Sequence, residues 1–125
     1  MTINLVIADC LLKTQIFNKI RPRDSDPNLK RLINGLFSKR WEEIIIKGIP
    51  FKKLYLGGTK YRAVVHARSE DCYLLVFYRF KNNDKSKNIS NYDNESSQEI
   101  YKNFLKVIDC INHKTVTNYI YHKNN

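Results

Sequence analysis

The chain has 125 residues, 42% of them hydrophobic and 12% aromatic, which fits one domain with a single core and excludes a disordered chain. Its 22 Lys and Arg residues against 12 Asp and Glu residues give a net charge of +10 at pH 7, which favours an anionic partner, either nucleic acid or an acidic protein. No apolar run approaches the roughly 20 residues that span a bilayer and no signal-peptide pattern opens the chain, so we expect one cytoplasmic domain over residues 1–125 and no membrane partner.

A short strand and a helix are predicted for the N-terminal segment. Residues 3–8 are mostly β-branched and apolar, which favours a strand. Asp9 is placed to cap the following helix, because its carboxylate can accept hydrogen bonds from the free N–H groups of the first turn. The helix is expected to end before Pro22. Its apolar stripe consists of Leu12, Ile16 and Ile20.

A second and longer helix is predicted from Asp26 onward. Asp26 is a good helix cap, and the fixed backbone angle of Pro27 suits the first helical turn. The apolar residues behind them follow helical spacing, and Gly48 and Pro50 end the run. The predicted stripe comprises Leu29, Leu32, Ile33, Leu36, Phe37, Trp41, Ile44 and Ile45.

Three strand-like segments follow, at residues 51–56, 60–68 and 72–81. The connections between them are short enough for hairpins, since they consist of little more than two glycines in one case and residues 69–71 in the other. Consecutive antiparallel pairing is the simplest topology for such segments, so we predict a three-stranded meander.

The last part of the chain is predicted to hold a loop, a helix and a strand. Residues 82–95 are rich in Asn, Lys, Ser and Asp and predict a mobile loop. A capping-box pattern at residues 96–99 starts a third helix, whose apolar stripe runs from Ile100 to Ile111. Residues 115–121 have enough β-propensity for a last strand or an ordered tail. The whole pattern predicts an α+β fold of order β-α-α-β-β-β-α(-β), with helices packed on one face of a small antiparallel sheet.

The segment at residues 60–68 carries the clearest functional pattern. Its side chains alternate between faces, so one face is mostly apolar and is expected to pack on the helices. The other face gathers Lys60, Arg62, His66 and Arg68. Such a row suits a phosphate backbone, because each neutralised phosphate releases counterions and a guanidinium can hold two oxygens. Alternating charge is also typical of the solvated side of an antiparallel sheet, so a binding and a structural interpretation both stay open.

The neighbouring strands add cations and tyrosines to this pattern. Arg79 and Lys81 are expected beside the start of the basic strand, with Lys52 and Lys53 available from the strand before it. Tyr78 points to the opposite face unless a bulge re-aims it. Tyrosines among cations offer stacking surfaces for unpaired bases, although aromatic residues in a sheet more often belong to the core.

The sequence indicates no metal site and no cofactor. No two histidines, and no histidine and carboxylate, have metal-ligand spacing, and the three cysteines lack a C-x-x-C pair. The chain also lacks a phosphate-binding P-loop and the G-x-S-x-G elbow of many hydrolases.

Two segments resemble the RelE/ParE/HigB superfamily of bacterial toxins. The stretch at residues 51–63 is similar to the family segment in which a Lys, a Leu and a Gly precede a strand that bears Tyr or Arg. The stretch at residues 73–81, followed by a Lys-rich loop and a helix, resembles the HigB-like ending. Together with the order of the elements, the resemblance covers roughly residues 27–111.

The resemblance implies a metal-independent mRNA endoribonuclease that acts on the ribosome, inhibits translation and is made together with an antitoxin protein. In such enzymes the ribose 2′-OH attacks the adjacent phosphate, and cationic side chains stabilise the charge on the non-bridging oxygens. By position, Arg62 and Arg79 would be the catalytic electrostatic stabilisers. His66, Tyr78 or a C-terminal residue such as Tyr121 would transfer the proton. The RNA-binding residues would be Lys52, Lys53, Lys60, Arg68 and Lys81.

Three other functions stay open from the sequence. One is a non-catalytic nucleic-acid-binding or regulatory protein of a mobile element, which would use the basic face for affinity alone. Another follows from the resemblance, because some members of the superfamily act on DNA gyrase instead of RNA. The third is an interaction protein whose charge complements an acidic partner.

Overall fold

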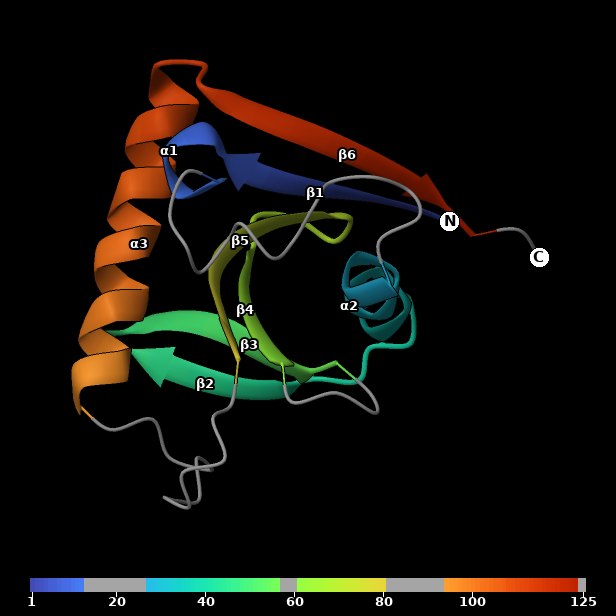
Figure 1. Ribbon diagram of the computed structural model, residues 1–125, viewed down its shortest axis with the longest axis horizontal. Helices are drawn as coiled ribbons and strands as arrows, with labels where there is room; N and C mark the ends of the chain where they lie inside the picture. The colour runs from blue at the N-terminus through green and yellow to red at the C-terminus, as the bar shows by residue number, and fades with distance from the viewer. Residues whose placement is uncertain (13–26, 57–60, 81–93, 124–125) are drawn as a thin grey trace.

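The computed structural model describes residues 1–12, 27–56, 61–80 and 94–123, which form one six-stranded sheet and three helices (Figure 1). The strands are β1 (Thr2–Ala8), β2 (Glu42–Ile46), β3 (Ile49–Tyr55), β4 (Tyr61–Ala67), β5 (Cys72–Phe80) and β6 (Val116–His122). The helices are α1 (Asp9–Leu12), α2 (Pro27–Phe37) and α3 (Asn94–Asn112). The predicted α+β class is confirmed.

The sheet has the strand order β2-β3-β4-β5-β1-β6 and is mostly antiparallel. Antiparallel pairing joins β2, β3, β4 and β5 in sequence, which confirms the predicted meander and extends it by one strand. β1 lies parallel to β5, and β6 pairs with β1 in the antiparallel sense. The two terminal strands therefore lie together at one side of the meander, and β2 and β6 form the edges of the sheet.

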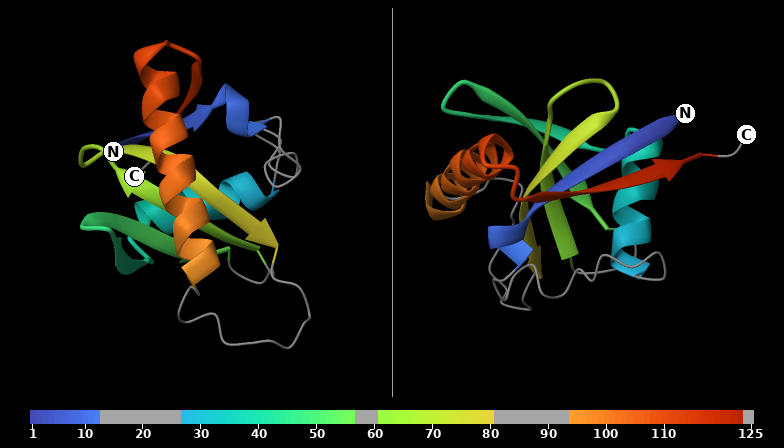
Figure 2. Two further views of the ribbon diagram at one scale, coloured as in Figure 1. Left: turned by 90° about the vertical axis from the view of Figure 1, so that its left-hand side faces the viewer. Right: turned by 90° about the horizontal axis from the view of Figure 1, so that it is seen from above.

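The two long helices cover opposite faces of the sheet (Figure 2). Phe104 of α3 packs edge-on against Phe51 of β3, with ring centroids 5.5 Å apart. On the other face, a Cβ added to Gly35 of α2 would lie only 2.8 Å from the Cδ2 of Leu54 in β3. Because strand side chains alternate between faces, Phe51 and Leu54 mark the two sides of the sheet. The structure thus departs from the expectation that the helices share one face.

The predicted long helix ends earlier than its apolar spacing indicates. Its first part forms α2 and ends at Phe37, but residues 42–46 form the strand β2, with Trp41 between the two elements. Three consecutive isoleucines in β2 favour a strand, because β-branched side chains lose rotamer freedom in a helix. Lys47 and Gly48 then form a two-residue hairpin turn with φ of 51° and 79°, the geometry that matches the twist of paired strands.

The other predicted elements are found where the structure describes them. α1 begins at Asp9, whereas the rest of the predicted first helix and nearly all of the predicted loop at residues 82–95 lie outside the described residues. α3 begins just before the capping-box pattern, and its Ile100 and Val107 are fully buried against the sheet. β6 confirms the predicted last strand.

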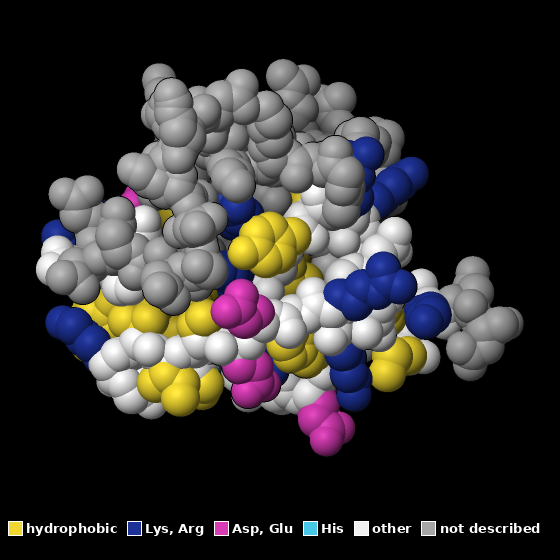
Figure 3. Space-filling model, turned by 90° about the horizontal axis from the view of Figure 1, so that it is seen from below, with side chains coloured by type: hydrophobic (Ala, Val, Ile, Leu, Met, Phe, Trp, Pro, Cys, Tyr) yellow, Lys and Arg dark blue, Asp and Glu magenta, His cyan; other side chains and the backbone are white. Residues whose placement is uncertain are grey.

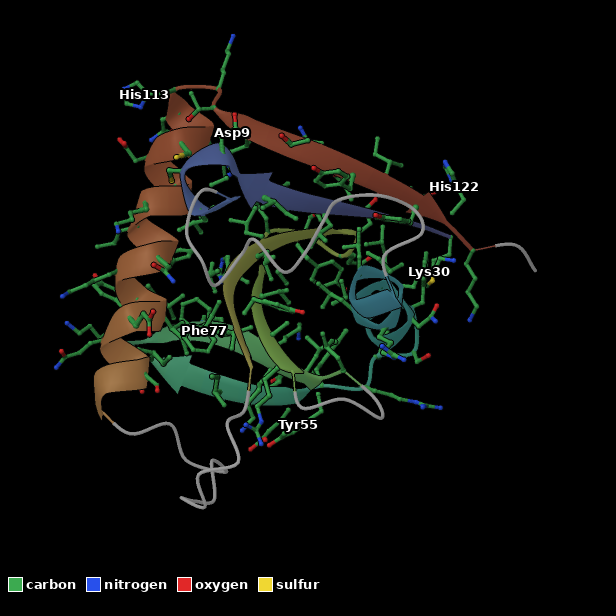
Figure 4. The ribbon with its side chains drawn as sticks, in the orientation of Figure 1. Asp9, Lys30, Tyr55, Phe77, His113 and His122 are labelled. Atoms are coloured by element: carbon green, nitrogen blue, oxygen red, sulfur yellow. The ribbon has the colours of Figure 1, made fainter. Side chains whose placement is uncertain are left out.

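Apolar side chains fill both faces of the central strands. Leu5 and Ile7 of β1 and Leu75 and Phe77 of β5 are all buried, and Phe77 lies between the sheet and α3 (Figure 4). Burial of such surface is the main stabilising contribution to folding. Because both faces are covered there, a charged ligand can approach the sheet only at the ends of the strands or at its edges.

Candidate functional site

Among the described residues, the cationic row predicted on β4 is interrupted and partly buried. β4 has the predicted alternation, but α3 lies over the face that carries Arg62 and His66. Arg62 is only 8% exposed, and Val64 between the two is fully buried. Arg68 is exposed beyond the end of β4, and Lys60 lies outside the described residues. The continuous basic surface expected from the sequence is therefore absent from the described part of this face.

The contacts of His66 indicate a role in packing. Its Nδ1 lies 2.9 Å from the carbonyl oxygen of Pro50, which can only accept, so the imidazole donates this hydrogen bond. The ring also packs against Phe51 and Phe104, with centroid separations of 5.6 and 4.8 Å. His66 lies four positions after Arg62 along β4, a distance of about 13 Å in a strand. His66 is thus too far from Arg62 to serve the same phosphate.

Tyr78 and Tyr121, the other residues expected to transfer a proton, also lie away from Arg62. The register pairs Tyr78 with Ala63, so the tyrosine lies on the opposite face of the sheet from Arg62, where it is buried. The bulge in this strand pair occurs further along β4 and does not re-aim Tyr78. Tyr121 lies in β6, three strands from β4, which corresponds to about 14 Å across the sheet.

Arg62 itself meets three other side chains at one end of the sheet: Tyr55, Lys53 and Glu42. We call these four residues the Tyr55 cluster. The register pairs Tyr55 directly with Arg62, so both side chains emerge on the same face. The ring centroid of Tyr55 lies 4.9 Å from the Cζ of Arg62 and 5.3 Å from the Nζ of Lys53, both within cation–π range. Tyr55 is 52% exposed and lies at the lower end of the sheet (Figure 4).

Within the cluster, the carboxylate of Glu42 pairs with Lys53 and not with Arg62. The Nζ of Lys53 lies 3.2 Å from a carboxylate oxygen of Glu42. In the described part of the chain, no carboxylate lies within ion-pair distance of Arg62, and its buried Nε has no hydrogen-bond partner. A buried donor without a partner costs free energy that a bound anion would recover. Arg62 is therefore the best candidate for anion binding among these four residues.

Lys52, which was expected to hold RNA, lies on the opposite face of β3 from the cluster. Its Nζ is 2.8 Å from a carboxylate oxygen of Glu43 and 4.3 Å from the ring centroid of Trp41. Its charge is therefore already matched, like that of Lys53. Seen from below, one acidic side chain adjoins a hydrophobic side chain, and Lys or Arg side chains lie next to the same hydrophobic side chain (Figure 3).

The remaining predicted cations lie at the end of the same sheet or outside the described residues. The β4–β5 register places the backbone of Arg79 directly opposite Arg62, as expected from the order of the strands. The side chain of Arg79 and all of Lys81 lie outside what the structure describes. The predicted position of Arg79 beside the start of the basic strand is thus confirmed for the backbone alone.

Tyr55 is the site residue that the sequence reasoning missed. The alternation of β3 places Tyr55 on the face of Lys53, two residues earlier. The hairpin register between β3 and β4 then decides which residue of β4 it meets, and this is Arg62. The alternation within each strand could therefore be read from the sequence. The register between the two strands could not, because the length of the connection does not determine it.

Among the described residues, no group of three His, Cys, Asp or Glu side chains is placed to hold a metal ion. None of the described helices has the length and apolar character needed to span a membrane. Comparison of the chain with protein-family models, with curated proteins and with solved structures gives no match.

Proposed function

We propose that this protein is the toxin of a type II toxin–antitoxin system, a metal-independent endoribonuclease that cleaves mRNA on the ribosome, with Arg62 at the scissile phosphate. The observation that carries the proposal is the largely buried Arg62 side chain, whose guanidinium lies over the ring of Tyr55 and has no carboxylate partner among the described residues. The net charge of +10 supports an anionic substrate. The resemblance of residues 51–63 and 73–81 to the toxin superfamily supplies the reaction class.

The chemistry requires little more than stabilisation of charge. The ribose 2′-hydroxyl loses its proton to solvent as its oxygen attacks the adjacent phosphorus, and the bond from phosphorus to the 5′-oxygen breaks, which leaves a 2′,3′-cyclic phosphate and a 5′-hydroxyl. Negative charge builds up on the non-bridging oxygens, which the guanidinium of Arg62 can hold in pairs. The partly exposed Tyr55 offers its ring for stacking an unpaired base and its hydroxyl for protonation of the leaving oxygen.

A second candidate function is favoured by the positions of two predicted proton-transfer groups. His66 is hydrogen-bonded to the Pro50 carbonyl and Tyr78 is buried on the other face, so neither can transfer a proton at Arg62. A site with one cation and one tyrosine suffices to bind a phosphate without cleaving it. The alternative is therefore a non-catalytic RNA-binding protein that uses the same cluster for affinity.

Substitution of Arg62 tests the proposal. We expect Arg62→Gln to lower the rate of mRNA cleavage on translating ribosomes by about a hundredfold, as loss of one charge-stabilising donor typically does, and to abolish growth arrest on expression. The matched control is Arg31→Gln, which removes the same charge from an exposed position on α2, the helix on the opposite face of the sheet, and should change the rate less than about threefold.

Thermal unfolding of both variants shows whether the fold is retained. Equal activity of the two folded variants would contradict the assignment of Arg62. If the unmodified protein binds RNA through Arg62 but yields no cyclic-phosphate product on ribosomes, the non-catalytic function replaces the endoribonuclease.

A further inference from the structure

The outer edge of β6 carries backbone groups that no strand of the described sheet uses. The N–H of Asp9 donates to the carbonyl of Thr115 at 3.0 Å, and the N–H of Lys123 donates to the carbonyl of Met1 at 2.9 Å. These bonds identify the β6 residues whose backbone groups point toward β1, because the direction of the N–H and C=O groups alternates along the strand. The residues whose N–H and C=O groups point outward are Val116, Asn118, Ile120 and His122.

The two edges of the sheet differ in how well they are protected against strand addition. β2 has five residues and begins with Glu42 and Glu43, and short charged edge strands discourage pairing. β6 has seven residues and contains no Lys, Arg, Asp, Glu or Pro. Ile120, in the middle of β6, is 59% exposed. Of the two edges, β6 is the one whose sequence permits another strand to pair with it (Figure 1).

A groove lies between α2 and the C-terminal end of β6, where residues 121–123 line it. Its volume is about 450 Å³. Ile33, Phe37 and Tyr121 supply apolar lining, while Lys30 and Lys123 supply positive charge. Figure 4 shows Lys30 on α2 and His122 at the neighbouring end of β6. A strand added to β6 would project alternate side chains toward α2, which is how strand addition combines backbone affinity with side-chain selectivity.

Charge decides which kind of strand fits. The groove is lined by two lysines and by no Asp or Glu side chain among the described residues. A second copy of the chain is disfavoured, because each copy carries a net charge of +10 and antiparallel pairing of two β6 strands would bring Lys114 of one copy near Lys123 of the other. An acidic segment would instead complement the lysines.

We infer that the outer edge of β6, together with this groove, binds an extended acidic segment of a partner protein by antiparallel or parallel strand addition. The site is separate from the Tyr55 cluster, since β6 is three strands from β4. The inference therefore does not depend on the proposed ribonuclease function, and Arg62→Gln should leave this binding unchanged.

A synthetic peptide of about seven residues, the length of β6, with alternating Glu and Val is a suitable probe for the full chain. We expect it to bind, and the same peptide with Lys in place of Glu to show no binding. On binding of the acidic peptide, hydrogen exchange at the Asn118 and Ile120 amides should slow, whereas the inward-pointing Tyr119 amide should be protected with and without peptide.

Two variants separate strand addition from simple charge attraction. Asn118→Pro removes one outward N–H without removing a bond to β1, and should weaken peptide binding about fivefold. Lys30→Glu with Lys123→Glu should weaken it about tenfold, while the matched control Lys102→Glu with Lys106→Glu, at exposed positions on α3, should leave it unchanged.

Three results would overturn the inference: no binding of the acidic peptide to the unmodified chain, equal weakening by the α3 control pair, or binding without slower exchange at Asn118 and Ile120. The exchange measurement uses the unmodified chain, so the test stands even if the proline variant does not fold.

Discussion

The Lys53 side chain is fully buried, although lysine is among the residues least often found in a protein interior. It is held there by Glu42 at 3.2 Å, whose side chain is about half exposed, and by the ring of Tyr55. A buried ion pair contributes little net stability, but loss of one partner leaves a charge uncompensated. Lys53 and Glu42 are therefore expected to respond very differently to substitution.

Glu42→Gln should lower the free energy of unfolding by about 1 to 3 kcal/mol, because it leaves the buried ammonium without its carboxylate. Lys53→Met should leave stability unchanged or raise it, since an apolar chain of similar length replaces the charge. Urea denaturation measures both. The control is Glu43→Gln, whose partner Lys52 is partly exposed, with an expected change below about 0.5 kcal/mol. Greater destabilisation by Lys53→Met than by Glu42→Gln would contradict this account.

For single residues, the sequence predicts the face of the sheet better than it predicts burial or side-chain partners. It correctly predicts that Arg62 and His66 share one face of a strand and that Tyr78 lies on the other, because alternation is a local property. It does not predict that Arg62 is buried, because burial depends on tertiary packing around the strand and not on alternation within it. The partnership of Arg62 with Tyr55 depends in the same way on register.

At the scale of elements, the error over residues 38–46 shows the limit of periodicity. Ile44 and Ile45 fit helical spacing after Phe37, and the same residues belong equally well to a β-branched run that ends in a hairpin turn. The backbone already leaves the helical conformation at Lys39, which has a φ of 54°. The lysine side chain gives no sign of this in the sequence. Predictions succeed where two independent signals agree, as in α3, which has both a capping pattern and an apolar stripe.

The contact between α1 and α3 allows a prediction about redox chemistry. The Sγ atoms of Cys10 and Cys110 lie 3.1 Å apart, although one hundred positions separate them in the sequence. With excess oxidised glutathione, the Cys10 thiolate is expected to attack the glutathione disulfide and Cys110 to displace the bound glutathione, so that one protein disulfide forms and two glutathione thiols are released. Closure of so long a loop stabilises by at most about 5 kcal/mol.

Burial and the neighbouring Cys110 thiol raise the pKa of the Cys10 thiol above its ordinary value. The attacking species is the thiolate, so the reaction should be slow at neutral pH and become faster as pH rises. Mass spectrometry of the oxidised protein and non-reducing thermal unfolding measure the outcome. Cys72→Ser should behave like the unmodified chain, and Cys10→Ser should form no internal disulfide. Loss of the disulfide in the Cys72 variant instead would show that a different pair reacts.

At the scale of the whole molecule, the net charge of +10 overstates the positive charge that is available to a ligand. Lys52 and Lys53 are both paired with carboxylates from β2. Arg62 has no such partner among the described residues, and the groove beside β6 has its own two lysines. Total charge predicts that an anion binds, whereas the sheet register decides which cations are free to contact it.

The salt dependence of RNA binding tests this distinction. Each phosphate neutralised on a single strand contributes about 0.7 to the slope of log K against log salt concentration. Arg62→Gln is therefore expected to reduce the magnitude of that slope by about 0.7 between about 50 and 200 mM salt, whereas Lys53→Met should leave it unchanged because Glu42 already matches this charge. Fluorescence anisotropy with a short unstructured RNA gives both slopes. Equal losses of slope in the two variants would mean that the Glu42 pairing does not persist when RNA binds, and that the cluster binds phosphate through both cations.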